Sequence, residues 1–204
     1  MRKFFAVAAV VAVSLCFPVF TLAQKEAGKP RAAAPGVHMS QKLLDEAMDP
    51  GAGQKKLAPL VGTFDVKVRT WASPSAPPVE FSGVNVNAWV LGDRFLQLMF
   101  STVFEGELIS SMSYIGYNNV AKRYEMASMD TGGTDIQFFT GNFDPSGTHM
   151  TLKASIYEPG SAKPSPVELR VTTQSNGDHA VEFWGAGPDG KLFDMMQLKY
   201  TRKQ

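Results

Sequence analysis

Residues 61–71, VGTFDVKVRTW, alternate between apolar and polar side chains with a period of two. Phe64, Val66 and Val68 occupy the apolar positions, and charged residues separate them. Successive side chains of a β-strand point to opposite faces of the sheet. The pattern therefore predicts a strand with one dry face and one solvated face.

Similar runs recur along the whole chain after Gly62, and turn-forming residues separate them. Short links such as LGD, EGE and SNGD, with no helical pattern between the runs, favour an antiparallel meander. A meander of about ten strands usually closes on itself, because closure removes the exposed edges. We therefore expect an all-β fold, an antiparallel meander closed into a β-barrel of about ten strands, with a β-sandwich as the alternative. The expected strands cover about 63–71, 79–91, 94–104, 107–117, 121–129, 134–143, 148–158, 166–174, 179–186 and 191–202.

One short helix is expected before the first strand. In residues 40–51, SQKLLDEAMDPG, Ser40 can cap a helix start, and Pro50 and Gly51 end the helical pattern. The apolar stripe of this helix is Leu43, Leu44 and Ala47. The segment 54–62, QKKLAPLVG, can add one more helical turn.

Residues 1–23, MRKFFAVAAVVAVSLCFPVFTLA, have the features of a secretory signal peptide. Two basic residues precede an apolar run, and small residues precede an expected cleavage after Ala23. An uncleaved membrane anchor is the alternative, which Pro18 disfavours by interrupting the run. A lipoprotein is rejected because Leu15 stands before Cys16, where lipoprotein processing needs a small residue. The sequence thus predicts an exported protein, periplasmic or secreted.

Removing this segment leaves 18 basic and 19 acidic residues, and it takes away the only cysteine. A net charge of −1 without basic runs argues against a nucleic-acid partner. Without cysteine there is no disulfide framework, and no further apolar run is long enough to cross a membrane. We expect residues 24–37 to be a flexible lead and residues 38–204 to form a single domain.

Five stretches follow one another in the order of a known family. They are LAPLVGTFDV, GDRFL, GYNNVAKRYEMASMDTGG, FDPSGTHMTL and GPDGKLFDMMQLKYTRK, between Leu57 and Lys203. Together they resemble the bacterial family called domain of unknown function 1579 (DUF1579). The resemblance implies a lipocalin-like barrel and carries no activity with it. Asn118 stands where the family often has aspartate, and Ser128 where it commonly has tryptophan.

The segment LVGTF also resembles a weakened form of the Gly-x-Trp signature that opens the first strand of lipocalin-type barrels. In that pattern an arginine from the last strand lies across the aromatic ring and closes one end of the barrel. Gly62, Phe64 and Arg202 are the matching positions here. A guanidinium over a ring contributes about 0.5–2 kcal/mol. The alternative is a solvated terminal arginine.

A barrel of eight to ten strands is wide enough inside for one small ligand. Methionine suits an adaptable apolar lining, and Ser110, Ser128 and Thr140 on the same faces would suit an amphipathic guest. We therefore expect binding or sequestration of a small hydrophobic or amphipathic molecule, with an ordinary filled core as the alternative. The expected lining residues are Val66, Val68, Met112, Tyr114, Tyr124, Met126, Phe138, Phe183, Met196 and Leu198.

Candidate catalytic residues are few. No nucleophile elbow, phosphate loop or dinucleotide fingerprint is present, and the three histidines show no metal-ligand spacing. His179 flanks a turn, which disfavours a haem site built on a single histidine, so we expect no cofactor and no metal. The alternative of a barrel enzyme depends on rim carboxylates, with Asp194 expected to point inward. These carboxylates are Asp130, Asp135 and Asp194.

Residues 94–104, RFLQLMFSTVF, are apolar on both faces of the expected strand. Leu96, Leu98 and Phe100 occupy one face, and Phe95, Met99 and Val103 occupy the other. An apolar outer face needs cover from outside the barrel. We expect either the 41–49 helix or a second copy of the chain to supply it. Besides a binding protein and a barrel enzyme, the third functional alternative is therefore an interaction protein that docks through this strand.

The signal peptide gives a first testable expectation. The mature protein should begin at Gln24, because signal peptidase cuts after small residues such as Ala23. Intact mass spectrometry of the protein recovered outside the cytoplasm measures this directly. A mass that retains residues 1–23, or that carries a lipid, would contradict it.

Overall fold

The computed structural model describes residues 40–158, 160–187 and 189–204, and Met39–Gln204 form one compact unit. The expected signal peptide and the flexible lead lie outside the described residues. The strands are β1 (Gly62–Thr70), β2 (Val79–Val90), β3 (Phe95–Phe104), β4 (Glu107–Asn118), β5 (Arg123–Asp130), β6 (Gln137–Phe143), β7 (His149–Ile156), β8 (Ser165–Thr173), β9 (His179–Ala186) and β10 (Leu192–Arg202).

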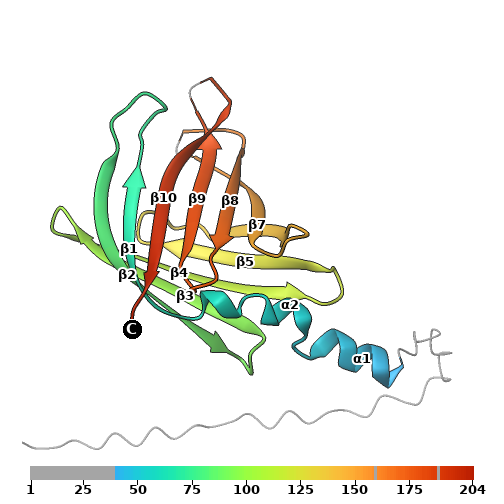
Figure 1. The fold of residues 1–204 in the computed structure, drawn as a ribbon. Coiled ribbons are helices and arrows are strands. Elements are labelled where there is room, and N and C mark those ends of the chain that lie inside the picture. The colour runs from blue at the N-terminus through green and yellow to red at the C-terminus, as the bar shows by residue number, and fades with distance from the viewer. Residues whose placement is uncertain (1–39, 159, 188) are drawn as a thin grey trace, which may run out of the picture. The chain divides into compact units, whose positions relative to one another are not determined.

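These strands form a closed antiparallel barrel in the order β1-β10-β9-β8-β7-β6-β5-β4-β3-β2 (Figure 1). Every strand pairs with the strands next to it in the chain, and β1 also pairs with β10 to close the ring. Phe64 thereby lies opposite Asn85 on one side and Arg202 on the other. The expected fold class, an all-β meander closed into a ten-stranded barrel, is confirmed.

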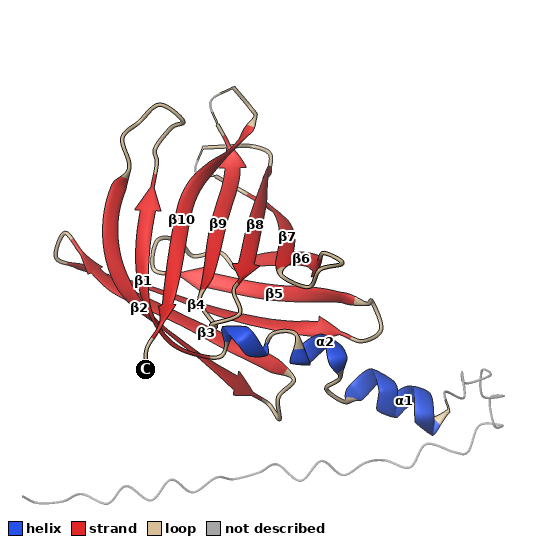
Figure 2. Ribbon diagram, in the orientation of Figure 1, coloured by secondary structure: helices blue, strands red, loops and turns tan. Residues whose placement is uncertain are grey.

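The helical segments are α1 (Gln41–Met48), α2 (Ala52–Lys55) and the 3₁₀ turn η1 (Ala58–Leu60), and all precede β1 (Figure 2). Ser40 caps α1 as expected, since its hydroxyl accepts a hydrogen bond from the Leu43 amide at 3.4 Å. The expectation that this helix covers the outer face of residues 94–104 is wrong. No residue of α1 is buried, and Phe95, Met99 and Val103 on the outer face of β3 stay exposed. An ion pair of 3.5 Å joins Asp49, just after α1, to Arg94, just before β3.

Residues 52–61, which we call the end plug, cover the barrel end where β1 begins. Leu57 is fully buried and Leu60 is 5% exposed within the main hydrophobic core. The Gln54 side chain donates to the Tyr117 carbonyl at 2.9 Å, and the Tyr124 hydroxyl donates to the Gly53 carbonyl at 2.8 Å. A Cβ at Gly53 would collide with the Tyr117 ring, so this close approach requires glycine.

Arg202 fastens the end plug to the barrel. Its Cζ lies 4.8 Å from the Phe64 ring centroid, and Phe64 is fully buried. Its guanidinium also donates to the Val61 carbonyl at 2.7 Å and to the Pro59 carbonyl at 2.8 Å. Gly62 has a φ of 137°, and a Cβ there would meet the guanidinium. Gly62, Phe64 and Arg202 therefore form one structural unit at the closed end.

Phe64→Ala should lower the free energy of unfolding by about 3–5 kcal/mol, because it leaves a cavity at a fully buried site. Arg202→Ala should cost less. The two losses should fall short of additivity by about 0.5–2 kcal/mol, because both remove the same ring contact. Denaturant unfolding of the single and double variants measures this coupling.

Lys203 provides the matched control, since it pairs with Asp65 at 2.9 Å outside the ring contact. The Phe64→Ala and Lys203→Ala losses should simply add. A zero coupling between Phe64 and Arg202 would show that the guanidinium does not stabilise the ring.

Candidate ligand-binding cavity

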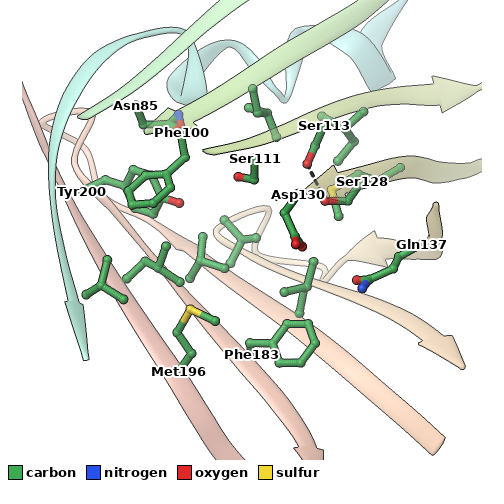
Figure 3. A pocket seen from close by; sticks show the side chains of 18 of the residues that line it. Asn85, Phe100, Ser111, Ser113, Ser128, Asp130, Gln137, Phe183, Met196 and Tyr200 are labelled. Atoms are coloured by element: carbon green, nitrogen blue, oxygen red, sulfur yellow. Dashed lines mark hydrogen bonds between the residues drawn. The ribbon is translucent and has the colours of Figure 1, made fainter. Parts of the chain in front are cut away.

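The barrel encloses a cavity of about 710 Å³. Each of the ten strands contributes at least one lining side chain, and Leu60 of η1 contributes from the end plug. The lining is mainly apolar, and aliphatic and aromatic side chains come from every side of the barrel (Figure 3). Ligand sites for small molecules typically have volumes of 300–1,000 Å³, so the cavity is large enough for one such molecule.

Uncharged polar groups lie at the closed end of the cavity. Asn85 and Asn87 of β2 are 4% and 3% exposed. The Asn87 amide donates to the Leu60 carbonyl at 2.7 Å, and the Asn85 amide donates to the Asn87 side-chain oxygen. Asn87 thus links the barrel to the end plug, while Asn85 and Tyr200 line the cavity beside it (Figure 3).

His179 is the buried titratable group of this end, with 4% of its surface exposed. Its ring stacks on Tyr200 at a centroid distance of 4.1 Å and meets the edge of Phe64 at 4.7 Å. Burial lowers the pKa of His179 to about 4, and the nearby charge of Arg202 acts in the same direction. The imidazole is therefore neutral at pH 7, and its Nδ1 has no hydrogen-bond partner among the described residues.

Tyr200 is the second perturbed group at the closed end. Burial raises the pKa of its hydroxyl well above the ordinary value. The hydroxyl therefore stays protonated across the physiological range and can donate a hydrogen bond. Together with Asn85 and the neutral His179, it gives the cavity a polar but uncharged floor.

The middle and the open end of the cavity carry small and acidic side chains. Ser113 donates to Ser128 across β4 and β5 at 2.8 Å (Figure 3). Asp130, at the end of β5, accepts a hydrogen bond from the Gly132 amide at 2.7 Å, and Figure 3 shows its side chain directed into the cavity. Glu107, at the start of β4, also lines this end. The cavity therefore runs from a neutral floor to an acidic mouth.

Seven of the ten residues expected to line the cavity are buried or half-buried on the inner face of the barrel. Val66 and Tyr124 pack into the core, at 0% and 2% exposed, without lining the cavity. The five that line it are Val68, Met126, Phe183, Met196 and Leu198.

The other three expected lining residues point outward. On β4 the inward side chains are Ser111, Ser113 and Ile115, so Met112 and Tyr114 lie on the outer face. Ser110 shares that outer face. Met112 and Tyr114 were predicted to face inward because they are large and apolar. The strand instead turns its small serines inward, and their small volume leaves room for the cavity.

On β6 the prediction of which side chains face inward was also wrong. Phe138 is 68% exposed, and its neighbour Phe139 is 1% exposed and lines the cavity. Thr140 shares the outward phase of Phe138. Two consecutive phenylalanines fit either register, and a shift of one residue reverses every side chain of a strand.

The expectation that Asp194 points inward is corrected by a β-bulge in β10. Asp194 lies opposite Trp184, whereas Met196 lies opposite Phe183, and the register shifts between them. Phe183 and Met196 line the cavity, so Asp194 shares the outer face with Trp184. Burial there raises the pKa of Asp194, and its Oδ2 accepts a hydrogen bond from Gln197 at 2.5 Å. Asp130 and Asp194 therefore lie on opposite sides of the barrel wall.

Sequence reasoning missed the polar floor. Asn85 and Asn87 stand two residues apart in NVNAWV, with Val84 and Val86 on the other face. The alternation was visible, but an apolar-inward assignment puts the asparagines outside. Buried asparagines need hydrogen-bond partners, which they find here in each other and in the Leu60 carbonyl of the end plug.

An apolar row crosses the outer face of four strands. The residues of this row lie directly opposite one another in the register, and Met99 is 44% exposed. The row consists of Val86, Met99, Met112 and Met129. Phe95 and Val103 of the same β3 face are 41% and 68% exposed. Docking of a second copy of the chain through the strand 94–104 stays a prediction.

Within the described part of the chain, no three histidine, cysteine, aspartate or glutamate side chains gather closely enough to hold a metal ion. The described helices also include none with the length and apolar character needed to cross a membrane.

The fold and the cavity define a closed ten-stranded barrel with an enclosed, mainly apolar site. The chain belongs to the family described as "Protein of unknown function (DUF1579)", which matches residues 49–202. Among solved structures it is similar to the crystal structure of Rv2717c from M. tuberculosis, at 18% sequence identity and a TM-score of 0.55. That likeness covers 76% of this chain and 100% of the other, and it supports the fold. No curated protein matches the sequence.

The buried histidine makes stability depend on pH. The pKa of His179 falls from 6.5 in the unfolded chain to about 4 in the folded protein, so between these values the unfolded state binds more protons. Above pH 6.5, neutral His179 makes its full contribution to the free energy of unfolding. As the pH falls toward 4, the folded protein loses about 2–3 kcal/mol of this free energy. His179→Phe should remove this pH dependence, measured as the free energy of unfolding from pH 7 to pH 4.

His149→Phe is the matched control, because the His149 side chain is 62% exposed. This variant should keep the steep part of the wild-type slope and lose only the weak pairing of His149 with Asp144. Glu125, Glu168 and Asp194 also have shifted pKa values, but they contribute equally to all three proteins. Parallel stability curves for wild type and His179→Phe would show that His179 is not the group responsible.

Proposed function

We propose that this protein binds or sequesters a small hydrophobic or amphipathic molecule inside the barrel. The observation that carries the proposal is the cavity of about 710 Å³, lined by apolar side chains with polar groups at both ends. An apolar ligand that buries roughly 300 Å² would gain about 7 kcal/mol before ordering costs are subtracted. Without those costs, a gain of this size corresponds to a dissociation constant of roughly 10 μM.

Export is part of the same proposal. Residues 1–23 carry the charge, apolar run and small residues of a secretory signal, which would place the barrel in the periplasm or outside the cell. A barrel without cysteine in its mature part depends on packing and on the Arg202 closure for its stability there.

The alternative of a barrel enzyme has less support. Asp130 faces the cavity, Asp194 faces away from it, and Asp135 is not among the lining residues. General acid–base chemistry needs a donor and an acceptor that converge on one substrate. These three carboxylates do not converge, so binding is the better reading of the site.

Two neighbouring serines of β4 allow a direct test. Ser111 lines the cavity and Ser110 lies on the outer face, so Ser111→Trp should fill the cavity and Ser110→Trp should not. Wild type and Ser110→Trp should bind the apolar fluorescent probe N-phenyl-1-naphthylamine with one site per chain. Ser111→Trp should weaken this binding at least about tenfold, because the indole occupies ligand space.

Circular dichroism and thermal unfolding establish that each variant is folded before its binding is compared. Equal probe binding by folded Ser111→Trp and Ser110→Trp would place the probe outside the barrel. Failure of the folded wild type to bind this probe and a panel of fatty acids, isoprenoids and aromatic dyes would remove the proposal.

A further inference from the structure

The charged side chains that line the cavity all carry the same sign. Glu107 and Asp130 are its charged residues at neutral pH, and no lysine or arginine belongs to the described lining. Glu107 begins β4, and Asp130 ends β5 opposite Ser111, so both carboxylates lie toward the mouth. Along β4 they are four residues, or about 13 Å, apart, with Glu107 farther out. Neither carboxylate forms an ion pair with a described residue.

Among the described residues that line the closed end, none carries a positive charge. His179 is neutral there, and Asn85 and Tyr200 are uncharged. The charge of Arg202 reaches His179, but its guanidinium covers Phe64 and donates to the carbonyls of the end plug. A ligand carboxylate would therefore lose its hydration at the floor without a counter-ion, or face two carboxylates at the mouth.

We propose that the cavity selects amphiphiles with a protonated amine head, which lies at the mouth beside Asp130, and rejects amphiphiles with a carboxylate head. The proposal rests on the proposed function, because it requires the apolar tail of the ligand to occupy the barrel. The tail would contact apolar side chains such as Leu98, Met126 and Phe183. The amine would donate a hydrogen bond to Asp130, and Glu107, farther out along β4, would add to the negative potential of the mouth.

The expected preference is modest, because the mouth is open to solvent. Attraction between exposed charges changes affinity by roughly 1.5- to 5-fold for each pair. For one tail length the order should be amine, then alcohol, then carboxylate. The amine should bind about tenfold more tightly than the carboxylate. Salt screens exposed charges, so this ratio should shrink in 0.5 M NaCl while alcohol binding is not weakened.

The experiment uses the mature full chain at pH 7 and three ligands with the same ten-carbon tail. Decylamine, decan-1-ol and decanoate each displace N-phenyl-1-naphthylamine, and the displacement gives three dissociation constants. Amine binding tighter than carboxylate binding, with alcohol between them, supports the proposal. Alcohol binding without discrimination between the charged heads overturns this inference alone. Failure of all three to displace a bound probe overturns this inference, and failure of the probe itself and of the wider ligand panel to bind overturns the proposed function.

Matched variants assign the preference to the mouth. Replacing Asp130 by Asn and Glu107 by Gln together should abolish the advantage of decylamine over decan-1-ol, because the amides carry no charge. The control replaces Asp135 by Asn and Glu105 by Gln, which changes the net charge equally at nearby acids outside the lining. The control should keep the wild-type ratio. An unchanged ratio in the first variant, or an equal loss in the control, would overturn the proposal.

Discussion

The contact between Arg202 and Phe64 is the interaction on which the enclosed site depends. One guanidinium covers a fully buried ring and holds two carbonyls of the end plug. The ring in turn contacts His179 and Tyr200, which form the cavity floor. The buried ring of Phe64, the neutral imidazole of His179 and the guanidinium of Arg202 therefore lie together at the closed end of the barrel. Loss of the cation would leave the carbonyls of Val61 and Pro59 without this donor and would loosen the floor.

Strand positions could be predicted from the sequence because period-two alternation and turn residues are local signals. The closure could be predicted as well, since Gly62 and Phe64 at one end of the chain and Arg202 at the other match a known pattern. The orientation of each strand was harder to predict. At Phe138 and Phe139 two adjacent aromatic residues fit both registers.

The cavity itself was the least predictable feature, because it depends on which side chains are absent from the interior. Apolarity favoured Met112 and Tyr114 as inward residues, but β4 turns Ser111 and Ser113 inward instead. Small side chains at these positions leave the space that large ones would fill. The bulge beside Asp194 is equally invisible to alternation, since one extra residue in β10 exchanges inside and outside along the strand.

The pairing of β1 with β10 also determines how the protein reaches its native state. The hydrogen bond from Arg202 to Val61 joins positions 141 residues apart, so sealing the barrel requires closure of a very long loop. Such non-local contacts lower folding rates, since the entropy of loop closure is lost before the contacts form. A nascent sheet that has all ten strands but lacks the β1–β10 ladder has two open edges and an unsealed floor. The chain can therefore retain a guest only after its first and last strands have met.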